Sequence, residues 1–149
     1  MSNSRALFAE ESITGAVKRL LSGRVNEILE EMEFPILPVE FGNYRGGSAV
    51  VPVIALSTCE RTEKERIVRL DSYSLTITFA VPERNDSELL CYAYATAVDR
   101  ALAEDPALGG AAERAVLTGK KYVEPKTPQC GDCRNVVLTL KVSVLKERV

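Results

Sequence analysis

The chain has 149 residues and a mass of 16.3 kDa, which is the size of one domain. Apolar residues make up 46% and charged residues 27%, so the chain can bury a core, and neither disorder nor a coiled coil describes it. A net charge of −2 argues against a protein that mainly binds phosphate backbones. The chain has no histidine, which excludes Ser-His-Asp triads, Cys-His dyads and histidine-ligated metal sites within it.

Neither an export signal nor a membrane span is expected. Residues 1–11 contain an apolar stretch too short for a signal-peptide core, and we expect them to form a flexible segment. The longest other apolar run, residues 49–56, is interrupted by Pro52 and is far shorter than the roughly 20 residues of a membrane helix. We therefore expect a soluble protein that is made in the cytoplasm, has no membrane partner and keeps its four cysteines reduced.

The first half of the chain predicts one helix and one strand. Apolar residues recur at three- and four-residue intervals over residues 13–32, which predicts an amphipathic helix that Pro35 stops. Residues 50–57 predict a strand, and Pro52 places it at a sheet edge. Residues 59–66 are almost all charged or polar, which predicts an exposed connection, a protruding hairpin between two antiparallel strands.

The second half predicts a strand, a helix and further strands. Residues 68–81 alternate between apolar and Ser/Thr side chains, the pattern of a strand with one buried face. A second helix follows and ends near Glu104. After an irregular region, weak signals indicate short strands at 114–117 and 120–123, and a clear alternation indicates a final strand at 135–145.

This order of elements predicts a single α+β domain over residues 1–149. We expect a mainly antiparallel sheet with two helices packed on one face and a charged β-hairpin that protrudes. The opposite face of the sheet is rich in serine and threonine. Such a face is solvated in a monomer or covered in a subunit interface, and both readings stay open here.

A Cys-x-x-C motif, Cys130 and Cys133, has the spacing of a metal site or a redox disulfide. Without histidine, a zinc ion would need Cys59, Cys91 or carboxylates as its other ligands, and neither cysteine belongs to a second such motif. A loop precedes the motif and a strand follows it, unlike the thioredoxin arrangement. A tight turn that enters the last strand is favoured, so we expect no cofactor and no metal. A small metal-binding or redox module that uses this pair is the alternative.

Four segments carry a family resemblance across most of the chain. They are the strand residues 73–82, the helix residues 91–94, the turn 105–110 with the sequence Asp-Pro-Ala-Leu-Gly-Gly, and residues 121–126. Together they resemble the tail terminator and tail-completion (head-tail joining) proteins of tailed bacteriophages. The turn is the most specific of these features.

The resemblance implies a structural virion protein and not an enzyme. Such a protein assembles in the bacterial host cytoplasm into a homo-oligomeric ring, usually a hexamer, on the last ring of tail-tube protein, in a free phage or a prophage. The ring ends tube polymerisation and offers a surface to the head-tail connector proteins. Its partners are thus itself, the tail tube and the connector, with DNA only in transit through the lumen. Whether the chain is a terminator or a head-tail joining protein stays open.

A ring requires heterologous contacts, in which one patch meets a different patch on the next subunit. We expect the charged hairpin and the loop region 105–127 to supply them, with ordinary surface loops as the competing interpretation. The candidate interface residues are Glu60, Arg61, Glu63, Lys64, Glu65, Arg66, Asp105, Leu108, Lys120 and Lys121.

Overall fold

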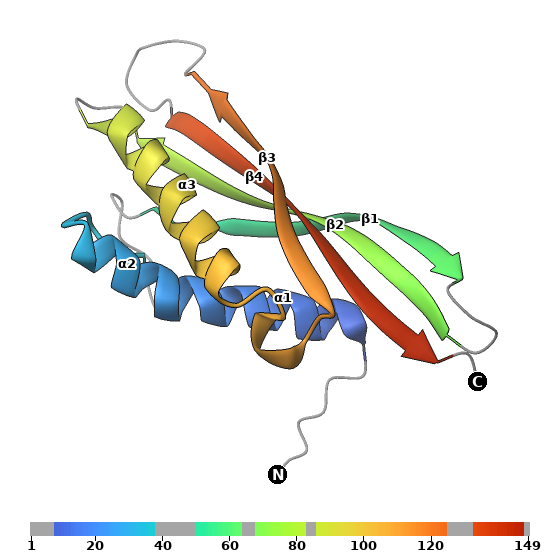
Figure 1. The fold of residues 1–149 in the computed structure, drawn as a ribbon. Coiled ribbons are helices and arrows are strands. Elements are labelled where there is room, and N and C mark those ends of the chain that lie inside the picture. Colours follow the sequence, from blue (N-terminus) through green and yellow to red (C-terminus); the bar gives the residue numbers. More distant parts are fainter. Residues whose placement is uncertain (1–7, 38–49, 64–67, 83–85, 125–132, 148–149) are drawn as a thin grey trace.

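Two layers make up the protein in the computed structural model: a four-stranded antiparallel sheet and a set of helices that cover one of its faces (Figure 1). The structure describes residues 8–37, 50–63, 68–82, 86–124 and 133–147. The elements in chain order are α1 (Ala9–Leu20), a π-helical turn η1 (Leu21–Val25), α2 (Asn26–Glu31), β1 (Val53–Glu63), β2 (Val68–Pro82), α3 (Ser87–Glu104), a short 3-10 turn η2 (Leu108–Gly110), β3 (Arg114–Val123) and β4 (Cys133–Glu147). The predicted α+β class is confirmed.

The first helical segment runs without a break from α1 through η1 to α2. Its stripe of apolar residues is buried against the sheet, as the spacing predicts. The helix begins at Ala9, so the last three residues of the segment 1–11, which we expected to be flexible, are helical. After the helix ends, the side chain of Asn26 binds both the N–H and the C=O of Leu37, at 2.7 and 3.1 Å. This buried amide fixes the returning chain against the helix.

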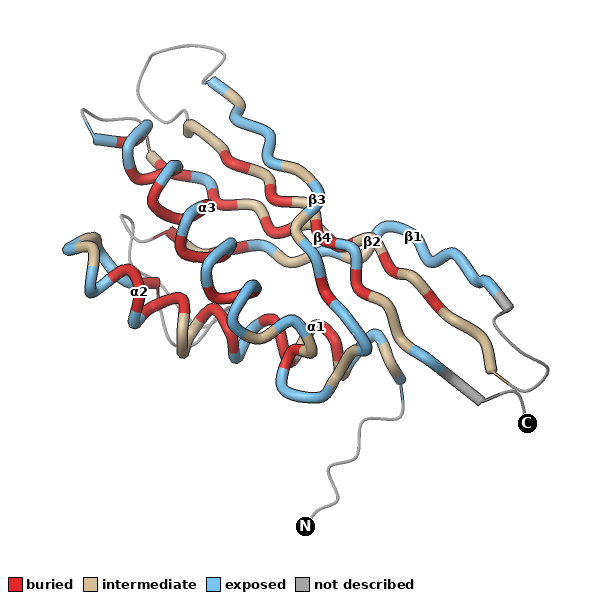
Figure 2. Tube along the Cα trace, in the orientation of Figure 1, coloured by how far each residue is buried: buried red, intermediate tan, exposed pale blue. Residues whose placement is uncertain are grey.

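The strand order in the sheet is β1-β2-β4-β3, and every neighbouring pair is antiparallel. The central strands β2 and β4 turn most of their apolar residues toward the helices and their Ser/Thr residues away from them. The ring of Phe79 in β2 stacks on that of Tyr94 in α3, with centroids 5.0 Å apart. Buried residues are concentrated between the two layers (Figure 2).

Three boundaries differ from the sequence-based expectation. The ladder between β1 and β2 continues to Glu63, so the first part of the charged stretch 59–66 is strand and not connection. Residues 114–123 form one strand, β3, whose register shifts between Leu117 and Gly119, where two short strands were expected. The last strand is also longer than residues 135–145 at both ends.

The sheet extends beyond the helices. The C-terminal parts of β1 and β4 and the start of β2 project past the first turn of α1 (Figure 1). This projecting end has no helix over it in the described part of the chain, and none of residues 53–62 in β1 is buried. The charged stretch therefore forms strand without forming core.

No helix in the described part of the chain is long and apolar enough to cross a membrane.

Candidate subunit-contact surfaces

A buried carboxylate lies at the base of the projecting end. Asp71 is 1% exposed and occupies the helix-facing side of β2. The Nε atom of Arg61 in β1 donates a hydrogen bond to its Oδ1 atom at 3.0 Å, and this bond raises the pKa of Arg61. The Nε atom of Arg69 lies 3.4 Å from the same oxygen but makes no hydrogen bond to any described residue. Arg61, predicted as a contact residue, thus first of all neutralises Asp71.

The next residue along this face joins the sheet to the first helix. The hydroxyl of Tyr73 donates to the Oε2 atom of Glu10 at 3.3 Å. Burial raises the pKa of Tyr73, and the nearby Cys59 and Glu10 raise it further because a phenolate there would face negative charge. The inner face of the sheet therefore changes from apolar to polar where α1 begins.

The predicted hairpin residues fall in two groups. Glu60 and Arg61 lie in β1 and are exposed. The backbone of Glu63 lies opposite that of Arg69 in the last step of the β1-β2 ladder. Lys64, Glu65 and Arg66 lie outside the described residues. Since Glu60 sits opposite Ser72, its side chain belongs to the Ser/Thr-rich outer face, whereas that of Arg61 belongs to the inner face.

The second predicted region is a tightly built turn. The carboxylate of Asp105 accepts a hydrogen bond from the backbone N–H of Gly109 at 3.1 Å, which stabilises the turn. Gly109 and Gly110 have φ values of 66° and 100°, a conformation that favours glycine. Leu108 is 2% exposed and packs into the core, so it is not available as a contact residue. The expectation that Leu108 lies in the interface is corrected by its burial.

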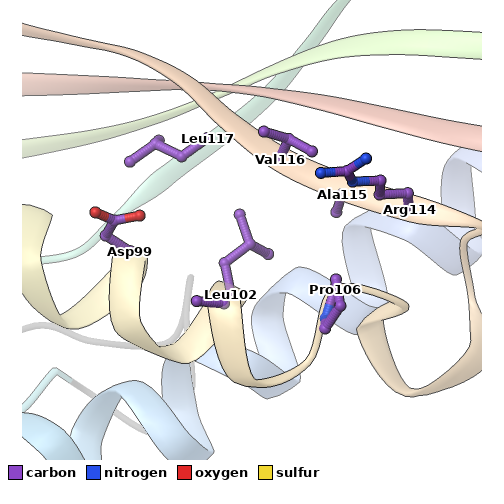
Figure 3. A pocket seen from close by; sticks show the side chains of 8 residues that line it. Asp99, Leu102, Pro106, Arg114, Ala115, Val116 and Leu117 are labelled. Atoms are coloured by element: carbon purple, nitrogen blue, oxygen red, sulfur yellow. The ribbon is translucent and has the colours of Figure 1, made fainter.

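A groove runs between α3 and the edge strand β3. One hollow in it has a volume of about 430 Å³, with Leu102, Ala103 and Pro106 on one side and residues 114–117 of β3 on the other. Asp99 and Arg114 lie at opposite ends of this hollow (Figure 3). A second hollow, of about 480 Å³, lies further along between the start of α3 and the end of β3.

Two aromatic residues line this second hollow. The rings of Tyr92 in α3 and Tyr122 in β3 meet edge to face with centroids 5.4 Å apart, although each residue is 46% exposed. Exposed Lys121 lines the same hollow, and Lys120 precedes it in β3. The structure does not bring these lysines near Glu60, because they lie on opposite edges of the sheet.

An ion network not anticipated from the sequence links the two helical segments. Arg24 in η1 donates to both carboxylate oxygens of Glu104 in α3, at 2.6 and 3.1 Å, and also contacts Glu27 and Glu31. The bond from Arg24 lowers the pKa of Glu104. Arg24, Glu27 and Glu31 lie on one solvated helix face, and Glu104 is 80 residues away from Arg24 in the sequence, so only the fold reveals the network. It stabilises the helical layer and offers no site for chemistry.

The cysteine motif is described only in part. Cys133 begins β4 and is half-buried, whereas Cys130 lies outside the described residues. Cys91 is buried in α3 and Cys59 is exposed in β1. Within the described residues, no group of three or more His, Cys, Asp or Glu side chains is arranged to hold a metal ion.

Comparison with known proteins returns no matching family model and no matching curated protein.

Proposed function

We propose that this protein is a structural subunit that closes into a ring and caps the tail tube of a tailed bacteriophage, as its sequence resemblance implies. The observation that carries the proposal is the pair of edge strands. β1 and β3 bound the sheet on opposite sides, and neither pairs with a further strand in the described part of the chain. The N–H of Ala115 in β3 donates to the carbonyl of Pro106 at 2.6 Å; beyond this residue, the edges offer backbone N–H and C=O groups to another chain.

The placement of the helices supports the same function. The helices in the described residues all lie on one face of the sheet, so a neighbour that continues the sheet also continues the helical layer (Figure 1). Because the two edges differ, such contacts are heterologous. They close into a ring when the equal rotations between successive subunits add up to one full turn. The outer face, which carries Ser72, Ser74, Thr76 and Thr78 of β2, then follows the circumference of the ring.

Deletion of the gene tests the tail function directly. In a lysate from a phage or prophage that encodes the chain, electron microscopy of the deletion should show tail tubes of uncontrolled length and heads without tails. Expression of the chain from a plasmid should restore normal particles. Infectious particles with tails of normal length in the deletion strain would refute the proposal.

A plasmid copy carrying Cys133→Ser serves as a matched control in the same experiment. The tail function predicts that this variant restores particles as well as the unchanged chain does. Failure of this variant alone, with a folded protein, would favour the metal-binding or redox alternative.

A further inference from the structure

One side of α1 points to solvent. Its residues follow one another at intervals of three or four along the helix, and none of them is buried: Phe8, Glu11, Thr14 and Lys18. The apolar stripe of α1, by contrast, is buried against the sheet. The turn after α3 meets α1 on a further side, where Ala16, Arg19 and Leu20 line the small hollow between them. The solvent side of α1 is therefore left for another molecule.

This side begins with an exposed aromatic ring. Phe8 is 62% exposed at the N-cap position of α1. Aromatic side chains that enter a pocket on a partner contribute much of the binding energy of protein interfaces. Glu11 lies one turn after Phe8, and Lys18 lies about 10 Å beyond Glu11 along the helix. Along α1 the solvent side is thus apolar, then acidic, then basic.

The first hollow between α3 and β3 has complementary features. A cavity of about 150 Å³ holds a benzene ring, so this hollow of about 430 Å³ has room for a phenyl ring. Arg114 and Asp99 lie at its opposite ends (Figure 3). Both are exposed, and within the described residues neither forms an ion pair. Between them the hollow is lined by apolar side chains, which include Leu102, Pro106, Ala115 and Leu117.

The sheet register puts these two surfaces at the same level. Glu10 at the start of α1 binds the hydroxyl of Tyr73, and Tyr73 shares a row of the sheet with Val142 and Ala115. Ala115 lines the hollow. In a ring whose copies stand side by side without a shift along the strands, the start of α1 in one copy is therefore level with the hollow of the next. This holds when edge β1 of the first copy faces edge β3 of the second.

At this level the neighbour meets side chains and not a bare strand edge. The N–H of Ala115 donates to the carbonyl of Pro106 at 2.6 Å, so the turn before β3 covers the edge here. Pro106 is exposed and forms one wall of the hollow. A phenyl ring from outside can pack against this proline without displacing the hydrogen bond.

The directions and charges of the two surfaces also match. α1 begins at the level of the Ala115 row, whereas α3 runs toward this row and is followed there by Pro106. The incoming α1 is thus antiparallel to α3. Glu11 and Lys18 are two helical turns apart, about 10 Å, and the hollow extends over about two turns of α3 and its turn. With its aromatic ring beside the proline, the incoming helix places its acidic residue at Arg114 and its basic residue at Asp99.

We infer that α1 of a second copy of this chain lies along the groove between α3 and β3, with Phe8 in the hollow and Glu11 beside Arg114. The inference rests on the proposed ring and specifies its subunit contact. Because the solvent side of α1 and the hollow are different surfaces, the contact is heterologous, as a ring requires.

Removal of the ring and reversal of the charges test this contact. Phe8→Ser empties the hollow, Glu11→Arg places two arginines together, and Arg114→Glu places two carboxylates together. Each variant should therefore self-associate at least about tenfold more weakly than the wild-type chain, measured by sedimentation velocity over a concentration series to about 1 mM. The double variant Glu11→Arg/Arg114→Glu pairs opposite charges again in every contact. It should assemble at least about threefold more strongly than either single charge variant.

Two matched controls lie on the opposite face of the sheet. Leu145→Ser removes an apolar side chain that is 43% exposed, and Lys141→Glu reverses an exposed charge, both in β4. Each control should leave assembly within about twofold of wild type. Circular dichroism of each variant checks that the fold is retained.

The outcomes separate the contact from the proposed function. Phe8→Ser assembling like wild type, or a double variant that assembles no better than its single variants, would overturn the inference while the proposed ring stands. A wild-type chain that is monomeric at every concentration would also overturn it, whereas the tail function is decided by the gene deletion.

Discussion

The buried carboxylate of Asp71 makes a testable contribution to stability. Replacing it with alanine would leave Arg61 and the buried Nε atom of Arg69 without their shared partner. Removal of one member of a buried ion pair typically costs about 3–5 kcal/mol. Here the side chains of Arg61 and Arg69 are 58% and 26% exposed, so water can solvate the freed charges in part. We therefore expect Asp71→Ala to lower the free energy of unfolding by about 2 kcal/mol.

Urea and thermal unfolding, followed by circular dichroism, measure this change. For a domain of this size the loss corresponds to a decrease in Tm of about 4–8 °C. Asp99→Ala is the control, since Asp99 is exposed and its removal should change the free energy of unfolding by less than about 0.5 kcal/mol. If Asp71→Ala changed stability as little as the control does, the ion cluster would not be a structural element of the sheet.

Three further predictions concern the core and the pH dependence of folding. Tyr94→Ala removes the ring that stacks on Phe79 and should cost about 3–5 kcal/mol in urea unfolding; a loss below about 1 kcal/mol would contradict the packing described. The lowered pKa of Glu104 stabilises the fold above its ordinary pKa of 4.5, and this stability is lost as the pH falls through the lowered pKa. The difference in stability between Glu104→Gln and wild type should therefore be largest at pH 7 and shrink as the pH falls below 4.5. A difference that stays constant over this range would show another cause. The raised pKa of Tyr73 stabilises the fold fully below pH 10 and less as the pH rises above it. Between pH 9 and 11 Tyr73→Phe should therefore lose less stability than wild type. Equal losses would contradict the raised pKa of Tyr73.

The interior of the fold could be predicted from the sequence because burial imposes a period. The three- and four-residue spacing from Ile13 onward and the alternation from Tyr73 to Val81 both reflect one face packed against a core. The exposed end of β1 carries no such period. Its residues from Cys59 to Glu63 are held by the ladder with β2 alone, so a charged sequence there looked like a loop.

The turns and charged clusters were predicted less well, for the same physical reason. Leu108 lies in a turn marked by Pro106 and two glycines, but its apolar side chain is anchored in the core. The burial of Asp71 was not predicted, although Asp71 continues the buried alternation of β2 by one step beyond Tyr73 and Arg69 lies two residues before it. The partner of Asp71 in β1, Arg61, is known only from the pairing of β1 with β2. Such long-range pairings depend on strand order, which no local pattern specifies.

The central claim is that copies of this chain assemble head to tail through two different sheet edges. The most direct test is the solution mass of the purified wild-type chain, by light scattering over a concentration series to about 1 mM. The account predicts a closed assembly, with six times the mass of the 16.3 kDa chain as the expected size. A single species of 16.3 kDa at every concentration would contradict it.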